Sequence, residues 1–292
     1  MSVDVYQYPS SPPPRMVRTL AVLGDSIGVG IGDPAIGGGW RGFAPLLAAA
    51  LGDTDLVNVS ANGARVRALR VRQLPAVVAA GPDAAIVLGG MNDTLRSDFD
   101  VRAITGDFDK VVGTLSGMGA VVVMVRYHDH GRVFRLPGPL HRALARRIDA
   151  LNSAIDEVAR RYQVGVVDLG ALPGTYLPGA WSVDRLHPSE WGHRMLARAL
   201  AERLAEGGVL AAGEVSPLCG GSATISTLDR LLWLLIKGLP WVFRRGADLV
   251  PYLLQALMEA LLRPDGVVTV EPAQVDRAAI RASRRGVGQR TS

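Results

Sequence analysis

The chain has 292 residues, of which 48% are hydrophobic and 20% are charged, and its formal net charge is +5. This composition supports a packed core, excludes global disorder and fits one medium-sized domain with an extension. A single cysteine, Cys219, excludes an internal disulfide and a cysteine metal site, and no zinc finger, helix-turn-helix or aromatic-basic signature suggests a nucleic-acid partner.

Residues 1–17 form a proline-rich leader that lacks the apolar core of a secretory signal. The longest strongly apolar stretch, residues 231–243, is interrupted by Lys237 and Pro240. It is shorter than the ~20 residues that a membrane-spanning helix needs. These features predict a cytoplasmic protein.

From Thr19 onward, short β-branched runs alternate with longer segments of helical period. The expected strands are Thr19–Leu23, Leu56–Val59, Ala85–Leu88, Ala120–Val125 and Val164–Val167. The expected helices are Trp40–Leu51, Val66–Ala80, Phe99–Leu115, Pro139–Tyr162 and Pro188–Glu206. Near-continuous apolar strands joined by helices predict a parallel sheet covered on both faces. Residues 18–208 are therefore expected to form a three-layer α/β/α, flavodoxin-like domain with a five-stranded parallel sheet.

The chain beyond residue 208 differs in composition. Residues 209–227 form a linker rich in small residues, and residues 228–263 are expected to form a helical extension rich in leucine and tryptophan. The extension has a leucine stripe with basic borders, which fits packing on the domain, a lid over an acyl pocket, a dimer contact or a peripheral membrane contact. Residues 264–292 form a polar, basic tail that we expect to be disordered.

The turn after the first expected strand is rich in glycine and reads GDSIGVGIGD over residues 24–33. A phosphate-binding P-loop would require Gly-Lys-Ser/Thr, and the turn contains no lysine. A dinucleotide-binding turn would require the spacing G-x-G-x-x-G, which does not occur here. Two interpretations remain. The turn is either a plain strand-to-helix turn capped by Ser26, or a seat for a nucleophilic serine.

The nucleophile interpretation requires partners, and loops after three other expected strands offer them. Gly63 follows the second strand, Asn92 follows the third, and Asp184 and His187 follow the fifth. Ligands of an open parallel sheet bind outside the carboxyl ends of its strands. These groups are therefore expected to converge with Ser26 on one crevice.

Four sequence blocks, taken together, resemble those of the SGNH, or GDSL-type, hydrolases. They are Gly24-Asp25-Ser26, Gly63, Gly90-Met91-Asn92-Asp93 and Asp184-Arg185-Leu186-His187. The resemblance covers about residues 18–206. It departs from the family at Ile27, which stands where the name-giving leucine usually sits.

The resemblance assigns a role to each block. Ser26 would be the nucleophile, His187 its general base, and Asp184 the carboxylate that orients His187. Backbone N–H groups of Ser26 and Gly63 and the side-chain amide of Asn92 would form the oxyanion hole. The supporting residues, which order the loops, would be Asp25, Gly90 and Asp93.

These roles imply a serine hydrolase that cleaves carboxylic esters of a small molecule, lipid or glycan through an acyl-enzyme, without a cofactor. An acyltransferase that uses the same triad on a sugar or natural-product hydroxyl is one alternative. A non-catalytic lipid- or glycan-binding module is an alternative of a different class.

Histidines also occur after the fourth expected strand and on the last expected helix. His128, Asp129 and His130 follow the fourth expected strand, but they lack a clear third metal ligand. We expect them to shape the substrate pocket or to form a polar loop, and we expect no metal site. His193, on the last helix, is expected to be a solvated or capping group.

Overall fold

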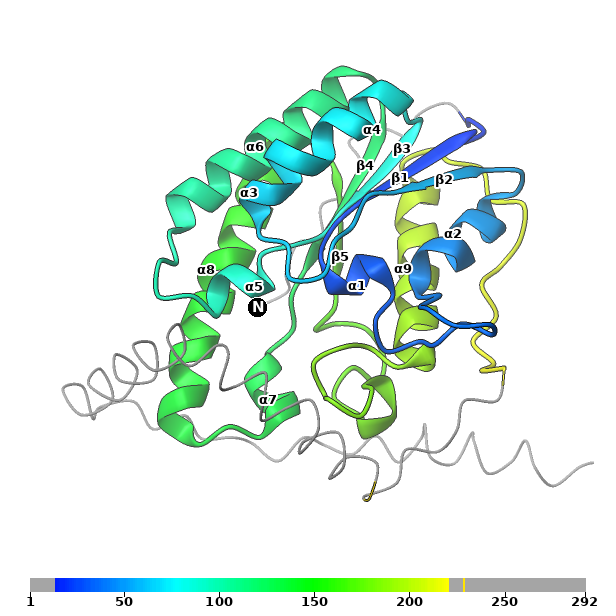
Figure 1. Ribbon diagram of the computed structural model, residues 1–292. Coiled ribbons are helices and arrows are strands. Elements are labelled where there is room, and N and C mark those ends of the chain that lie inside the picture. Colours follow the sequence, from blue (N-terminus) through cyan, green and yellow to red (C-terminus); the bar gives the residue numbers. More distant parts are fainter. Residues whose placement is uncertain (1–13, 221–227, 229–292) are drawn as a thin grey trace, which may run out of the picture. The chain divides into compact units, whose positions relative to one another are not determined.

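The computed structural model describes residues 14–220 and residue 228 (Figure 1). The helical extension 228–263, apart from Leu228, and the tail 264–292 lie outside the described residues, as do residues 1–13 of the leader and residues 221–227 of the linker. The lid, dimer and membrane contacts considered for the extension therefore stay predictions.

A sheet of five parallel strands forms the centre of the described part, in the order β2-β1-β3-β4-β5 (Figure 1). The strands are β1 (Thr19–Leu23), β2 (Asp55–Asn58), β3 (Ala84–Val87), β4 (Val121–Arg126) and β5 (Gly165–Asp168). Each begins within one residue of its expected position; the apolar runs of β1, β3, β4 and β5 are mostly buried, whereas the edge strand β2 is only partly covered. The expected five-stranded parallel sheet is confirmed.

Helices cover both faces of this sheet, as expected. The longer helices are α2 (Phe43–Leu51), α4 (Leu74–Ala80), α6 (Val101–Gly117), α8 (Gly138–Tyr162) and α9 (Glu190–Glu206). The segment expected as one helix from residue 66 to 80 includes α3 (Val66–Ala68) and a π-helical stretch, η1 (Leu69–Gln73), before α4. Helices α2 and α9 cover one face, and α3, α4, α6 and α8 cover the other (Figure 1).

Three helices begin later than expected: α6 begins at Val101 after its N-cap Asp100, and the other two are preceded by residues that take part in β-bridges. Trp40 pairs with Pro34, so α2 begins at Phe43. Pro188 pairs with Trp181, so α9 begins at Glu190, after a serine N-cap.

Four short helical segments were not expected, because one turn is too short to show a hydrophobic period. They are α1 (Ser26–Val29), α5 (Met91–Thr94), α7 (His130–Phe134) and the 3-10 turn η2 (Pro178–Ala180). The first three follow the ends of β1, β3 and β4, so they lie at the carboxyl edge of the sheet.

Strand order reverses between β1 and β3, since the chain adds β2 on one side of β1 and β3 on the other. Such a switch point opens a crevice at the carboxyl edge. Val17, Val209 and Val215, which lie just outside the 18–208 interval, also belong to the core. None of the helices in the described part of the chain has the length and hydropathy to cross a membrane.

Candidate active site

Ser26 is the first residue of α1, directly after β1. Asp25 caps this short helix: its Oδ1 accepts a hydrogen bond from Ile27 N at 3.0 Å. Gly30 ends the helix with a φ of +90°, a conformation that a residue with a side chain rarely adopts. The serine is 9% exposed.

Two glycines of the turn lie at close-packing positions. A Cβ on Gly28 would overlap the hydroxyl of Ser60, and a Cβ on Gly32 would overlap the carbonyl oxygen of Pro188. The glycine-rich turn that carries Ser26 is therefore in direct contact with the loop that carries His187.

The loop before α9 brings two predicted partners to Ser26. His187 Nε2 lies 2.9 Å from Ser26 Oγ, and His187 Nδ1 lies 2.6 Å from Asp184 Oδ2. The second carboxylate oxygen, Oδ1, accepts hydrogen bonds from Ser182 Oγ (2.7 Å), Leu186 N (2.8 Å) and His187 N (3.0 Å). Both oxygens of Asp184 are thus held by hydrogen bonds.

The charge of Asp184 decides the tautomer of His187. Burial raises the pKa of Asp184, but hydrogen bonds from His187 and Ser182 outweigh burial and hold this pKa below its ordinary value. An ionised carboxylate only accepts hydrogen bonds, so the proton of the neutral imidazole lies on Nδ1. The lone pair of Nε2 then faces the hydroxyl of Ser26, which is the arrangement that a general base needs.

The same loop is closed by its own backbone. Ser182 N donates to His187 O at 2.9 Å, and the Trp181–Pro188 bridge joins the two ends. Arg185 completes the tight turn with a φ of +54°. His187 lies in this loop and not in the helix, as expected from the proline that follows it.

Two of the predicted oxyanion donors belong to neighbouring loops. Gly63 has a φ of +74°, and Asn92 lies in α5. The amide of Asn92 donates to Ala64 O at 3.1 Å, which ties the two loops together and leaves its second N–H available. Within the described part of the chain, the N–H groups of Ser26 and Gly63 have no hydrogen-bond partner. A second contact, from Ala61 N to the carbonyl of Gly24 (3.1 Å), joins the Gly63 loop to the turn that precedes Ser26.

The residues expected to support these loops are buried. Asp93 accepts hydrogen bonds from Arg65 Nε (3.0 Å) and Val66 N (3.1 Å), which fixes the start of α3 against α5. Gly90 caps α5 with a φ of +110°, and a Cβ there would press against Leu151.

Asp25 is 1% exposed, and burial raises its pKa from 3.8 to about 6. Its carboxylate accepts a hydrogen bond from a backbone N–H of α1, which is consistent with a supporting role.

Sequence reasoning missed an ion-pair network that joins the segment after α1 to the start of α9. Arg41 donates to both oxygens of Asp33, at 2.9 and 3.0 Å, and lies 2.7 Å from Glu190 Oε1. Arg194 lies 2.9 Å from the same Glu190 oxygen. Glu190 and Arg194 have the i,i+4 spacing of a helix, but no spacing signal could have revealed the link from Arg41 to Glu190, because these two residues lie far apart in the chain.

Two expectations about histidines are wrong. His193 is neither solvated nor a capping group: it is 0% exposed, and its Nε2 lies 3.0 Å from Ile31 O. His128 and His130 do not form a polar loop at the surface, because each is 2% exposed; the alternative, that they shape the substrate pocket, stays a prediction. Spacing alone does not tell whether a polar residue after a strand turns inward.

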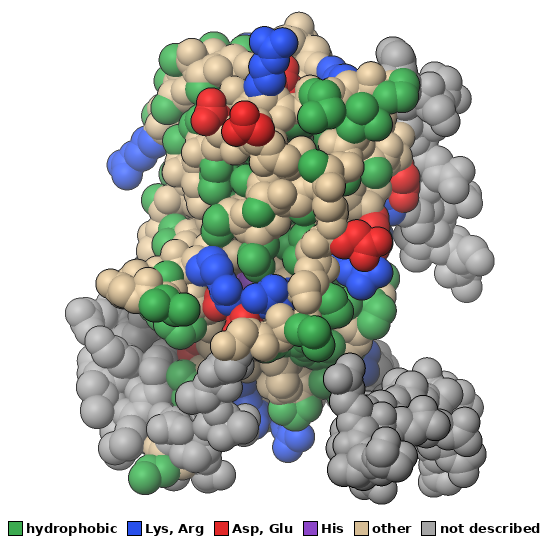
Figure 2. Space-filling view, turned by 90° about the vertical axis from the view of Figure 1, so that its right-hand side faces the viewer, with side chains coloured by type: hydrophobic (Ala, Val, Ile, Leu, Met, Phe, Trp, Pro, Cys, Tyr) green, Lys and Arg blue, Asp and Glu red, His purple; other side chains and the backbone are tan. Residues whose placement is uncertain are grey.

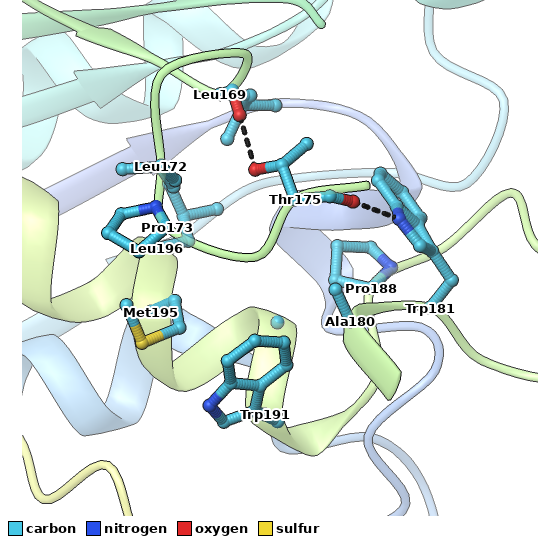
Figure 3. Close-up of a pocket in the computed structure, with 11 residues that line it drawn as sticks. Leu169, Leu172, Pro173, Thr175, Ala180, Trp181, Pro188, Trp191, Met195 and Leu196 are labelled. Carbon is cyan, nitrogen blue, oxygen red and sulfur yellow. Dashed lines mark hydrogen bonds between the residues drawn. The ribbon is translucent and has the colours of Figure 1, made fainter. Parts of the chain in front are cut away.

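An apolar cavity of about 30 Å³ lies behind the His187 loop, between that loop and α9 (Figure 3). Trp181 and Pro188 form part of its wall, and Trp191 and Met195 of α9 face them. The dashed bond in Figure 3 from Trp181 Nε1 to Thr175 O (2.6 Å) holds the indole at the cavity.

The molecular surface shown in Figure 2 carries acidic and basic side chains interspersed with hydrophobic ones. Among residues 14–220 and 228, no group of three His, Cys, Asp or Glu side chains is arranged to hold a metal ion.

A family model described as the GDSL-like lipase/acylhydrolase family matches residues 22–195, which is more than half of the chain. Three solved structures illustrate the similarity. An α/β hydrolase enzyme from the metagenome of Lake Arreo, Spain, is 24% identical, with a TM-score of 0.53 over 65% of this chain and 95% of that one. A catalytic mutant of an acetylxylan esterase from Geobacillus stearothermophilus is 20% identical, with a TM-score of 0.54 over 67% and 96%. A lipase/acylhydrolase from Enterococcus faecalis is 22% identical, with a TM-score of 0.51 over 65% and 96%. At these low identities, the structural similarity shows a shared fold alone. No curated protein matches the chain.

Proposed function

The chain belongs to the GDSL-like lipase/acylhydrolase family and is a carboxylic ester hydrolase, and we propose that it acts through an acyl-enzyme formed on Ser26. One observation carries the proposal. A continuous line of hydrogen bonds runs from Asp184 through His187 to the Ser26 hydroxyl, although 161 positions separate Ser26 from His187. Nucleophile, base and orienting carboxylate are thus in reach of one another.

In the first half of the reaction, Ser26 Oγ attacks the ester carbonyl carbon while His187 Nε2 takes the hydroxyl proton. Asp184 remains ionised and stabilises the imidazolium that forms. His187 then gives the proton to the alcohol oxygen, the bond between that oxygen and the acyl carbon breaks, and the acyl group stays on Ser26.

In the second half, His187 takes a proton from water, and the resulting nucleophile attacks the acyl carbon. The carboxylic acid leaves, and Ser26 recovers its proton from the imidazolium.

Both halves pass through a tetrahedral intermediate with a negatively charged oxygen. We assign the stabilisation of this charge to the N–H groups of Ser26 and Gly63 and to the amide of Asn92. The support is that the two backbone donors have no partner among the described residues, and that the amide is held in place by Ala64 O. Donors fixed before the reaction stabilise a charge that develops only in the transition state.

The test compares the wild-type protein with Ser26→Ala for release of p-nitrophenol from the acetate, butyrate and octanoate esters. Ser153→Ala is a matched control, because its hydroxyl binds a backbone carbonyl within α8. We expect Ser26→Ala to lose hydrolysis and labelling by a fluorophosphonate, and we expect the control to keep both.

Equal release by wild-type and Ser26→Ala proteins would refute the acyl-enzyme on Ser26. If Ser26 is labelled by the fluorophosphonate but acyl groups pass to an added alcohol faster than to water, the enzyme is an acyltransferase with the same nucleophile. Ligand binding without labelling or turnover would indicate a binding module.

A further inference from the structure

Two imidazoles lie in the interior at the end of β4, and the reaction described above does not use them. His128 and His130 are each 2% exposed, and His128 Nε2 lies 2.7 Å from His130 Nδ1. Their outer nitrogens, His128 Nδ1 and His130 Nε2, have no hydrogen-bond partner within the described part of the chain. Unpartnered buried polar atoms are unfavourable, so apolar side chains would serve better if packing were the only requirement.

Burial lowers the pKa of His128 to about 3. Burial, followed by the neighbouring His128, holds the pKa of His130 well below its ordinary value. Both rings are therefore neutral near neutral pH, and a single N–H···N hydrogen bond joins them. In such a pair one ring donates and the other accepts, which fixes the orientation of both rings.

Both imidazoles contact the indole of Trp181. The ring centroid of Trp181 lies 4.5 Å from that of His128 and 5.4 Å from that of His130. The indole also forms part of the wall of the apolar cavity, where its Nε1 donates to Thr175 O (Figure 3). The imidazole pair therefore blocks movement of Trp181 away from the cavity and toward β4.

Trp181 is the first residue of the loop that carries Asp184 and His187. The Trp181–Pro188 bridge and the bond from Ser182 N to His187 O close this loop at its neck. Because Asp184 and His187 are bonded to each other inside the closed loop, a shift of Trp181 moves them together. The distance that changes is the one between His187 Nε2 and Ser26 Oγ.

We propose that His128 and His130, as a hydrogen-bonded pair, are positioning residues that set the distance between His187 and Ser26 through Trp181. The inference rests on the proposed role of Ser26 as nucleophile. A misplacement of about 1 Å at a reacting group can reduce the rate about 100-fold.

The test uses three variants of the full chain. His130→Phe keeps a ring against Trp181 but removes the hydrogen bond to His128, whereas His130→Asn keeps an amide near the position of Nδ1. His141→Ala is the matched control, because His141 lies 2.7 Å from Asp129 Oδ2 and packs on Gly131 without a ring contact to Trp181. His128→Phe removes the same hydrogen bond from the other side and replaces His130→Phe if that variant does not fold.

For His130→Phe we expect kcat on p-nitrophenyl acetate and the rate of Ser26 phosphonylation to fall together by about 10- to 100-fold, with KM changed less than about twofold. His130→Asn is expected to recover most of this loss. The low-field proton NMR signal of His187 Nδ1–H is expected in every variant, because the Asp184–His187 bond lies inside the loop. His141→Ala is expected to lower the melting temperature and to keep kcat.

Wild-type kcat and phosphonylation in folded His130→Phe would overturn the inference. It would also be overturned if His130→Asn is as impaired as His130→Phe, or if the low-field signal disappears along with activity, which indicates local unfolding. Activity that survives in Ser26→Ala would refute the acyl-enzyme itself, and it is measured independently of these variants.

Discussion

Replacing Asp25 by asparagine tests the electrostatics beneath the nucleophile. The carboxyl group is almost fully buried, and its pKa is raised from 3.8 to about 6, mainly by burial. A raised pKa means that the folded state binds the proton more tightly than the unfolded state. This contribution to stability is complete below about pH 4 and is lost as the pH rises through about 6, which amounts to about 3 kcal/mol at pH 8.

Asp25→Asn keeps an oxygen that can accept from Ile27 N, and it carries no charge at any pH. We therefore expect the variant to exceed the wild-type free energy of unfolding by up to about 3 kcal/mol at pH 8, with the difference shrinking below pH 6. Urea unfolding at pH 5, 6, 7 and 8 measures this difference. Asp100→Asn is the control, because Asp100 also caps a helix but is exposed. A gain that does not depend on pH, or an equal gain in the control, would refute the argument.

Three further substitutions probe the site. Asp184→Asn is expected to lower kcat about 10⁴-fold, because the amide no longer fixes the imidazole tautomer. Steady-state kinetics measures this loss, and circular dichroism checks that the variant is folded like the wild type. Asn92→Ala is expected to lower kcat by about 10²- to 10³-fold with little change in KM, and a large rise in KM alone would contradict an oxyanion role. Gly32→Ala is expected to abolish activity or folding. Gly37→Ala is expected to keep both, because Gly37 has a similar φ (+94° against +103°) but open space around it. Equal effects of the two substitutions would show that backbone strain, and not the contact with Pro188, causes the loss.

Much of the fold follows from short-range patterns. The apolar runs predict all five strands to within one residue at their starts, and helical periods predict the long helices. The short helices α1, α5 and α7 depend instead on capping and on the loops around them. Asp25 and Asp129, for example, each cap one turn, and one turn has no measurable period.

The residues of the candidate site likewise include some that local sequence patterns predict and some that they do not. Ser26, Asn92, Asp184 and His187 could be proposed from the sequence because each follows a strand end, and parallel strands bring those ends to one edge of the sheet. The inward orientation of the histidines after β4 and on α9 could not, because it depends on which side chains close over them. Arg41 could not be assigned a partner either, since its two carboxylates lie 8 and 149 positions away along the chain.

The ion pairs of Arg41 with Asp33 and Glu190 give this site an unusual response to temperature. They join the segment that follows the nucleophile helix to the helix that follows His187, and both carboxylates are buried. The cost of removing charged groups from water falls as temperature rises, whereas hydrophobic stabilisation per unit area levels off. On heating, this junction therefore weakens less than the apolar core around it, and the two halves of the site stay joined while other parts of the fold begin to loosen.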